Sequence, residues 1–217
     1  MKTYKFLHMS IIISFLGIPG SGKSTLGKKL AKKLKIPFME EVGTQVILES
    51  GYTSAGFKLP YEFDERVFER NKERLEKTKK LLERTPVIWE SHFVTDTSYL
   101  LGRAFFGDNN PKRFKLFQKY QDPYFSSLND RTVFVILDMD PEESLRRQRE
   151  RNMPQLVTPD IKLLRYVRES FLKFYKQNKK RCIRIKDVDK KSEEEVLREI
   201  EEGLKPFLEE LENRKNN

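Results

Sequence analysis

Residues Met9 to Leu26 read MSIIISFLGIPGSGKSTL, and this stretch predicts how the rest of the chain is organised. The apolar, β-branched run from Ile11 to Leu16 is typical of a strand buried on both faces. It is followed by Gly17-x-x-x-x-Gly22-Lys23-Ser24 and then by a helical pattern rich in Lys and Leu that runs to Leu34. A strand, a glycine loop and a helix in this order are the context that a phosphate-binding loop requires.

The residue types in this loop match the needs of a triphosphate. Glycines lack Cβ, so the backbone can turn tightly and bring its N–H groups close to phosphate oxygens. The helix that follows adds the positive end of its dipole. Lys23 supplies a mobile charge for the β- and γ-phosphates, and the Ser24 hydroxyl is the expected Mg²⁺ ligand. The predicted nucleotide-binding residues of the loop are Gly17, Ile18, Pro19, Gly20, Ser21, Gly22, Lys23, Ser24 and Thr25.

Length and composition restrict the class of protein. At 217 residues, the chain suits one domain, residues 1–217, with a substantial core. No stretch approaches the ~20 apolar residues of a membrane span. A single cysteine, Cys182, excludes an internal disulfide and favours the cytoplasm. The net charge is +10, but Lys and Arg alternate with Glu on predicted helix faces, so nucleic-acid binding is not expected.

The remaining pattern alternates strands with helices. Such alternation predicts an α/β fold, a three-layer sandwich in which helices cover both faces of a five-stranded parallel sheet. Ligands of these sheets bind beyond the carboxyl ends of the strands. After the first strand, the others are expected at 36–39, 86–89, 132–137 and 182–185, and the helices at 24–34, 42–50, 61–84, 97–106, 111–128, 141–151, 160–179 and 192–211.

Acidic residues follow the second and third predicted strands. Glu40 and Glu41 end the second strand, and one of them is expected to face the cleft, where a carboxylate can accept a proton from an attacking hydroxyl or hold a sugar hydroxyl. The alternative is a charge that complements a helix N-terminus. Glu90 ends the third strand and is expected to act on Mg²⁺ through a water, or only to hydrogen-bond nearby backbone. Asp96 is expected at the same rim as a substrate ligand.

An arginine cluster follows the fourth strand. Arg147 and Arg151 are four residues apart, hence on one helix face, and two guanidinium groups there can neutralise charge on transferring phosphates. The alternative is a solvated basic face paired with neighbouring glutamates. We expect residues 141–160 to form an Arg-rich lid, whose 152–159 segment has the composition of a hinge.

Taken together, these motifs resemble the deoxynucleoside kinase and thymidylate kinase group of phosphate-loop kinases. The resemblance runs from Ile11 to about Leu204. Beyond the loop, it rests on PFME at 37–40, ESHFVTD at 90–96 and DPEESLRRQRER at 140–151, with YVRESF at 166–171 and IKDVD at 185–189 as further similar segments.

The resemblance implies transfer of the γ-phosphoryl group of ATP, with Mg²⁺, to the 5′-hydroxyl of a (deoxy)nucleoside. It implies strand order 2-3-1-4-5, a homodimer and an adenine-side loop that includes Asp187. Glu40 falls where these kinases carry the base for the 5′-hydroxyl. Catalytic roles are thereby implied for Lys23, Glu40, Glu90, Arg147 and Arg151.

Two departures from the family pattern leave the acceptor open. The Arg that usually follows the acid of the third strand is Ser91 here, so Arg103 or another side chain has to substitute, or activity is low or altered. Arg66 lies near the position where the family carries a Gln that reads the base. An Arg there binds carbonyls or a phosphate better than it reads a neutral amide edge. Arg70 or Arg74 is a candidate second phosphate ligand. A nucleoside monophosphate kinase and a non-catalytic ATP-binding switch are the alternative functions.

Overall fold

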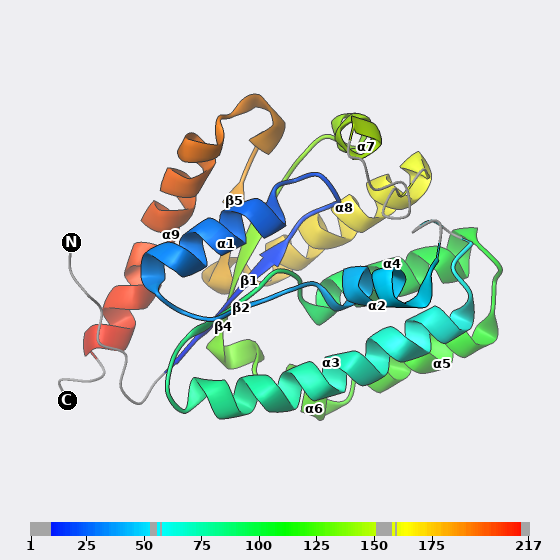
Figure 1. Cartoon of the computed structure of the whole chain (residues 1–217), viewed down its shortest axis with the longest axis horizontal. Helices are drawn as coiled ribbons and strands as arrows, with labels where there is room; N and C mark the ends of the chain where they lie inside the picture. The colour runs from blue at the N-terminus through cyan, green and yellow to red at the C-terminus, as the bar shows by residue number, and fades with distance from the viewer. Residues whose placement is uncertain (1–9, 53–55, 57, 151–157, 159, 214–217) are drawn as a thin grey trace.

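The structure is a computed structural model that describes residues 10–52, 56, 58–150, 158 and 160–213. It is an α/β sandwich around one parallel sheet (Figure 1). The strand order is β2-β3-β1-β4-β5, which confirms the predicted order. The strands are β1 (Ile12–Leu16), β2 (Phe38–Met39), β3 (Val87–Trp89), β4 (Thr132–Leu137) and β5 (Cys182–Ile185).

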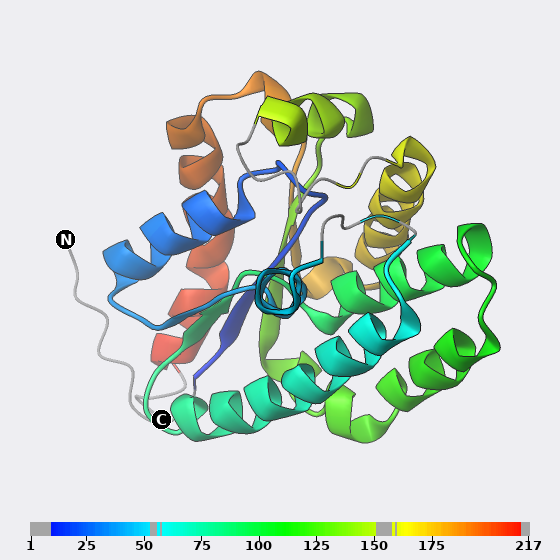
Figure 2. The same ribbon diagram turned by 45° about the vertical axis from the view of Figure 1, so that its right-hand side comes forward.

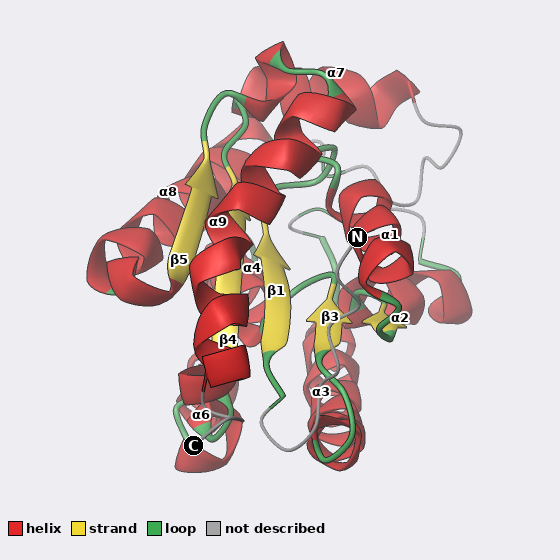
Figure 3. Ribbon diagram, turned by 90° about the vertical axis from the view of Figure 1, so that its left-hand side faces the viewer, coloured by secondary structure: helices red, strands yellow, loops and turns green. Residues whose placement is uncertain are grey.

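The apolar strands have helices on both sides because neither face of the central strands is polar enough to meet water. Ile13 and Phe15 of β1 are fully buried on one face, and Ile12 on the other. Figure 3 shows α9 crossing in front of the sheet with α4 and α8 behind it. Helix α1 shares the layer of α9, and α3 and α5 extend the opposite layer beside α4 (Figure 2).

Most helices lie where the pattern predicts them. The helices are α1 (Lys23–Leu34), α2 (Val42–Ser50), α3 (Tyr61–Leu82), α4 (Phe93–Phe106), α5 (Pro111–Tyr120), α6 (Pro123–Ser126), α7 (Pro141–Glu150), α8 (Ile161–Gln177) and α9 (Glu193–Asn213). Helix α7 lies above the carboxyl ends of the strands (Figure 3), at the edge where parallel sheets of this kind bind ligands.

Two helix predictions were wrong in extent. Helix α4 starts four residues earlier than expected, because the His92 side chain caps it by accepting the Val94 N–H at 3.3 Å. The helix expected over 111–128 is broken after Tyr120, where Asp122 caps a new turn by accepting the Tyr124 N–H at 2.8 Å. Pro123 sits at the first position of that turn, where its missing N–H costs nothing.

Across the described residues, we find no helix with the length and apolar character needed to cross a membrane.

Candidate active site

The glycine loop between β1 and α1 has the backbone of a phosphate cradle. Gly20 and Gly22 have φ angles of 84° and 93°, which side chains with a Cβ rarely adopt. Lys23 is the first residue of α1, and its side chain turns back so that Nζ donates to the Gly17 carbonyl oxygen at 2.8 Å. The predicted lysine therefore lies within the loop that it is expected to serve.

Helix α7 packs directly on this loop. Ser144 Oγ donates to the Pro19 carbonyl oxygen at 2.5 Å, and Arg147 Nη1 donates to the Gly20 carbonyl oxygen at 3.4 Å. A Cβ on Gly20 would lie only 3.3 Å from Arg147 Cβ. Hydrogen bonds from Arg146 and Arg147 lower the pKa of the Glu143 carboxyl to about 2. The alternative reading of a solvated basic face therefore fits Arg146, whereas Arg147 reaches the loop.

The expected lid residue Arg151 and residues 152–157 lie outside the described residues. The expected nucleotide-binding residue Asp187 is described, but this geometry does not bring it to the loop. Asp187 follows β5 with an exposed side chain that pairs with Lys190. Arg147 Nη2 donates instead to the carbonyl oxygen of Asp189, two residues further on, at 3.2 Å.

The predicted metal ligands meet beside the loop. The Ser24 hydroxyl donates to the Glu90 carboxylate, and the other oxygen of that carboxylate accepts the Glu41 backbone N–H at 3.0 Å. Burial first, and the nearby Glu41 charge second, raise the pKa of Glu90. A bound cation would stabilise the charged form of the Glu90 carboxylate against burial and the Glu41 charge. An alcohol oxygen together with a carboxylate is a donor set that Mg²⁺ prefers. The residues present therefore fit a magnesium ion.

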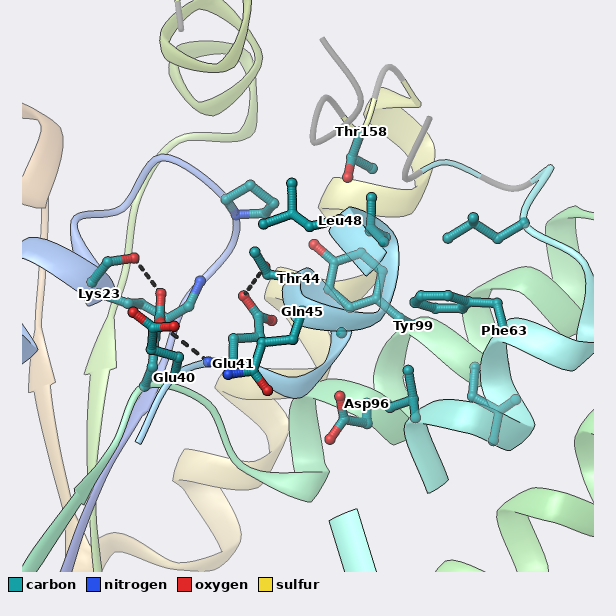
Figure 4. Close-up of a pocket in the computed structure, with 18 of the residues that line it drawn as sticks. Lys23, Glu40, Glu41, Thr44, Gln45, Leu48, Phe63, Asp96, Tyr99 and Thr158 are labelled. Carbon is teal, nitrogen blue, oxygen red and sulfur yellow. Dashed lines mark hydrogen bonds between the residues drawn. The ribbon is translucent and has the colours of Figure 1, made fainter. Parts of the chain in front are cut away.

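The two adjacent glutamates after β2 point to different surroundings. Glu40 is half-exposed and pairs with Lys28 Nζ at 2.9 Å, a contact that lowers the pKa of its carboxyl. Glu41 occupies the N-cap position of α2 without a side-chain hydrogen bond to the helix backbone, and its carboxylate accepts the Thr44 hydroxyl at 3.2 Å inside the pocket (Figure 4). Both residues line the cavity, and Glu41 is the less exposed of the two. The role of Glu40 as the base stays a prediction.

A cavity of about 340 Å³ runs from the glycine loop to the space between α3 and α4. Figure 4 shows Lys23, Glu40 and Glu41 at one end, Asp96 and Tyr99 further along, and Phe63 at the other end. The cavity is lined at this far end by Phe63, Asp64, Val67, Tyr99, Leu100 and Arg103. Its length and its apolar walls suit a ring-bearing molecule of modest size.

Asp96 lines this cavity, as expected of a substrate ligand. Its Oδ2 accepts Asn71 Nδ2 at 2.8 Å, and burial, opposed by the Arg74 charge, raises the pKa of its carboxyl to about 6. The same Asn71 amide donates to the Tyr120 hydroxyl at 3.1 Å. Asp96 is thus held in place by a side chain of α3.

The three arginines of α3 do not lie where a second phosphate ligand would. Arg66 donates to Ser50 Oγ at 2.8 Å and Arg70 pairs with Glu49 at 2.5 Å, both in an outer groove between α2, α3 and α5. Arg74 is only 6% exposed and donates to the Ser91 carbonyl oxygen at 3.0 Å. Arg66 and Arg70 line this outer groove and not the cavity, and Arg74 does not line the cavity either. The structure thus does not bring these three expected substrate-binding residues together with the others.

Asp64 and Arg103 are two cavity-lining residues that the sequence did not place at the site. Arg103 was considered only as a replacement for a phosphate ligand, and Asp64 was not considered. Each side chain is 4% exposed, and the two form an ion pair at the far end of the cavity. The sequence does contain a pattern that could have located Asp64. One face of α3 carries Phe63, Asp64, Val67 and Asn71, which repeat at helical spacing. The sequence alone did not show that this face meets a cavity.

Comparisons with known proteins agree with this architecture. The model of the deoxynucleoside kinase family matches residues 13–209. The chain is similar in structure to a deoxyadenosine kinase from M. mycoides with the products dCMP and a flexible dCDP bound, at TM-score 0.70 and 18% identity over 90% of this chain and 100% of that chain. It is also similar to a thymidylate kinase from Candida albicans, at TM-score 0.67 and 15% identity over 92% of each chain.

A gluconokinase from Sinorhizobium meliloti 1021 shares the fold at TM-score 0.55 and 20% identity, over 97% of this chain and 99% of that chain. At identities this low, the structural likeness shows the fold alone. No curated protein gives a significant match.

Proposed function

This chain belongs to the deoxynucleoside kinase family and is a phosphate-loop nucleoside kinase, and we propose that ATP with Mg²⁺ is its phosphoryl donor and that Glu41 is the base acting on the 5′-hydroxyl. The observation that carries the proposal is the position of the acids. Glu41, Glu90 and Asp96 all line the cavity, and the glycine loop and the aromatic end lie on either side of them.

This acidic middle favours a nucleoside over a nucleoside monophosphate as the acceptor. A phosphate monoester brings about −1.5 to −2 charges, and like charges repel strongly where water is scarce. Among the described residues that line the cavity, the cations are Lys23 in the loop, Lys28 beside Glu40, and Arg103 beside Asp64. Each is already engaged, so a neutral hydroxyl suits the middle of the cavity better.

The proposed chemistry uses groups that the fold has already positioned. The 5′-oxygen attacks the γ-phosphorus, the bond from that phosphorus to the β,γ-bridging oxygen breaks, and ADP leaves with the bond electrons. The proton of the hydroxyl passes to the Glu41 carboxylate. Lys23 and Arg147 stabilise charge on the transferring group. Mg²⁺, held by Ser24 and through water by Glu90, would neutralise the β- and γ-phosphates.

The far end of the cavity is proposed to hold the nucleobase. Phe63 and Tyr99 offer ring faces, and Leu100 completes an apolar wall. The Asp64 carboxylate accepts hydrogen bonds and the Arg103 guanidinium donates them. Such a pair fits a base edge that carries a donor next to an acceptor.

The test is ADP release measured with ATP and a panel of nucleosides and nucleoside monophosphates. We expect nucleosides to stimulate release. Glu41→Gln is expected to lower kcat by about 10²–10⁴-fold, and its matched control, Glu40→Gln, by less than about tenfold. ADP release with monophosphates only would overturn the acceptor class, and equal losses in the two variants would overturn the base. Tight ATP binding without stimulation by any acceptor would identify a switch instead.

Two further expectations belong with this proposal. The free thiol of Cys182 is partly buried, and burial raises its pKa to about 12, so this residue is expected to be unreactive. The homodimer implied by the family resemblance stays a prediction, which light scattering at micromolar concentration would check.

A further inference from the structure

Arg74 of α3 is a buried cation without an acidic partner among the described residues. Its guanidinium carbon lies 4.3 Å from the centre of the Trp89 ring and 5.5 Å from that of Phe93. Nη1 donates to the Ser91 carbonyl oxygen, while Nε and Nη2 are buried with no hydrogen-bond partner within the described chain. A buried guanidinium with two unused donors is costly, so its presence calls for an explanation.

The surroundings of Arg74 supply one. The carboxylates that act on its charge are Asp96 first, then Glu41 and Glu90. All three of these side chains line the cavity, whereas Arg74 does not. Arg74 therefore lies one layer beneath the floor on which the reaction is proposed to occur. In such a water-poor place, a fixed charge acts more strongly than it would in water.

Ser91, whose carbonyl oxygen accepts from Arg74, has a side chain that is itself unpaired among the described residues. It directly follows Glu90 at the end of β3, is 1% exposed, and its hydroxyl finds no partner among the described residues. The side chain at this position thus contributes neither charge nor a hydrogen bond. Its carbonyl oxygen is instead the anchor of the Arg74 guanidinium. The cation at this end of β3 comes from a helix seventeen residues earlier in the chain, not from the strand itself.

We propose that Arg74 is a positioning residue that offsets the charge of the acids on the cavity floor. Binding of ATP adds several negative charges beside Glu41, Glu90 and Asp96. Without a cation beneath them, the like-charged side chains of Glu41 and Asp96 would turn away from the cavity floor, and the acceptor hydroxyl would lose its base. Arg74 acts through the acids and need not touch the substrate. This inference rests on the proposed phosphotransfer.

A matched pair of substitutions separates the charge of Arg74 from its packing. Arg74→Lys and Arg74→Gln both lose the planar group that stacks on Trp89, but only the lysine keeps the charge. We expect Arg74→Gln to lower kcat by about 10²-fold, the usual loss for a preorganised electrostatic group, and Arg74→Lys to stay within about tenfold of the unmodified enzyme. KM for ATP should change by less than about threefold, because the glycine loop is untouched.

A relocation experiment tests the same inference independently. Ser91→Arg combined with Arg74→Ala moves the cation from α3 to the strand end, and the truncated side chain leaves room for it. We expect this double variant to recover at least tenfold in kcat over Arg74→Ala. Lys77→Ala, three residues further along α3 on its exposed side, is the control for loss of a cation and should match the unmodified enzyme.

Equal kcat values for folded Arg74→Lys and Arg74→Gln, or an unmodified kcat for either Gln or Ala at position 74, would overturn the inference. If Arg74→Ala does not fold, a double variant that folds but stays inactive would overturn it as well. The unmodified enzyme is assayed first with the acceptor that the panel identifies. Absence of turnover there would refute the proposed function itself, and it is seen before any variant is made.

Discussion

Asp64 is the centre of a buried ion network, and its replacement by asparagine tests how the far end of the cavity is built. The Asp64 carboxylate pairs with Arg103 and accepts Arg113 Nε at 2.7 Å. Arg113 is 0% exposed and also donates to the Leu59 carbonyl oxygen at 2.6 Å. Asp64→Asn keeps the shape but removes the charge and one of the two acceptor oxygens, so that Arg103 loses its ion-pair partner.

The magnitude follows from the burial of these groups. Removing one partner of a buried ion pair costs about 3–5 kcal/mol, because the other charge stays in a poor solvent. The free energy of unfolding of a domain is only about 5–15 kcal/mol, so this one change would remove a large share of the stability. Asp108→Asn is the matched control: Asp108 also pairs with Arg113 but is 47% exposed. The expected cost there is at most about 1 kcal/mol.

Urea denaturation followed by circular dichroism measures both variants. With a slope of about 3 kcal/mol per molar urea, a loss of about 4 kcal/mol lowers the midpoint by roughly 1.3 M. The Asp108→Asn midpoint should move by less than about 0.4 M. If the two midpoints shift equally, or if Asp64→Asn costs less than about 1 kcal/mol, the network does not hold this end of the cavity together.

Two further predictions concern stability. The Asp96 carboxyl has a pKa raised to about 6, above the ~3.9 of an unfolded chain, so the stability that it contributes is present below about pH 4 and lost as the pH rises through 6. Asp96→Asn should therefore match the unmodified chain in chemical denaturation at pH 4 and exceed it by up to about 3 kcal/mol at pH 8. A difference that does not change with pH would contradict this. A Cβ on Gly102 would lie 2.3 Å from Leu163 Cδ1, whereas one on Gly43 meets nothing closer than 3.9 Å. Thermal melting should show Gly102→Ala destabilised by about 1–3 kcal/mol and Gly43→Ala stabilised by about 0.5–1 kcal/mol, and a neutral Gly102→Ala would refute the tight packing of α4 on α8.

The glycine loop and the order of the strands could be predicted from the sequence because their signals are local. A β-branched run, glycines at fixed offsets and Lys23-Ser24 specify a strand, a turn and a helix start within about twenty residues. Alternation of strands and helices then restricts the sheet to parallel, right-handed connections. The acids at strand ends followed from the same rule, which brings Glu41 and Glu90 to one edge.

The direction of individual side chains at that edge was decided only by tertiary structure. Glu40 and Glu41 are adjacent residues of the same type, but they contact different segments. Lys28 on α1 pairs with the Glu40 carboxylate, whereas Glu90 after β3 accepts the backbone N–H of Glu41. A periodic pattern marks the buried face of α3, but it does not show what that face meets. The sequence by itself determined the backbone cradle and the layers, whereas contacts between distant segments decided which charges face the cavity, because the energy of a charge depends on every group around it.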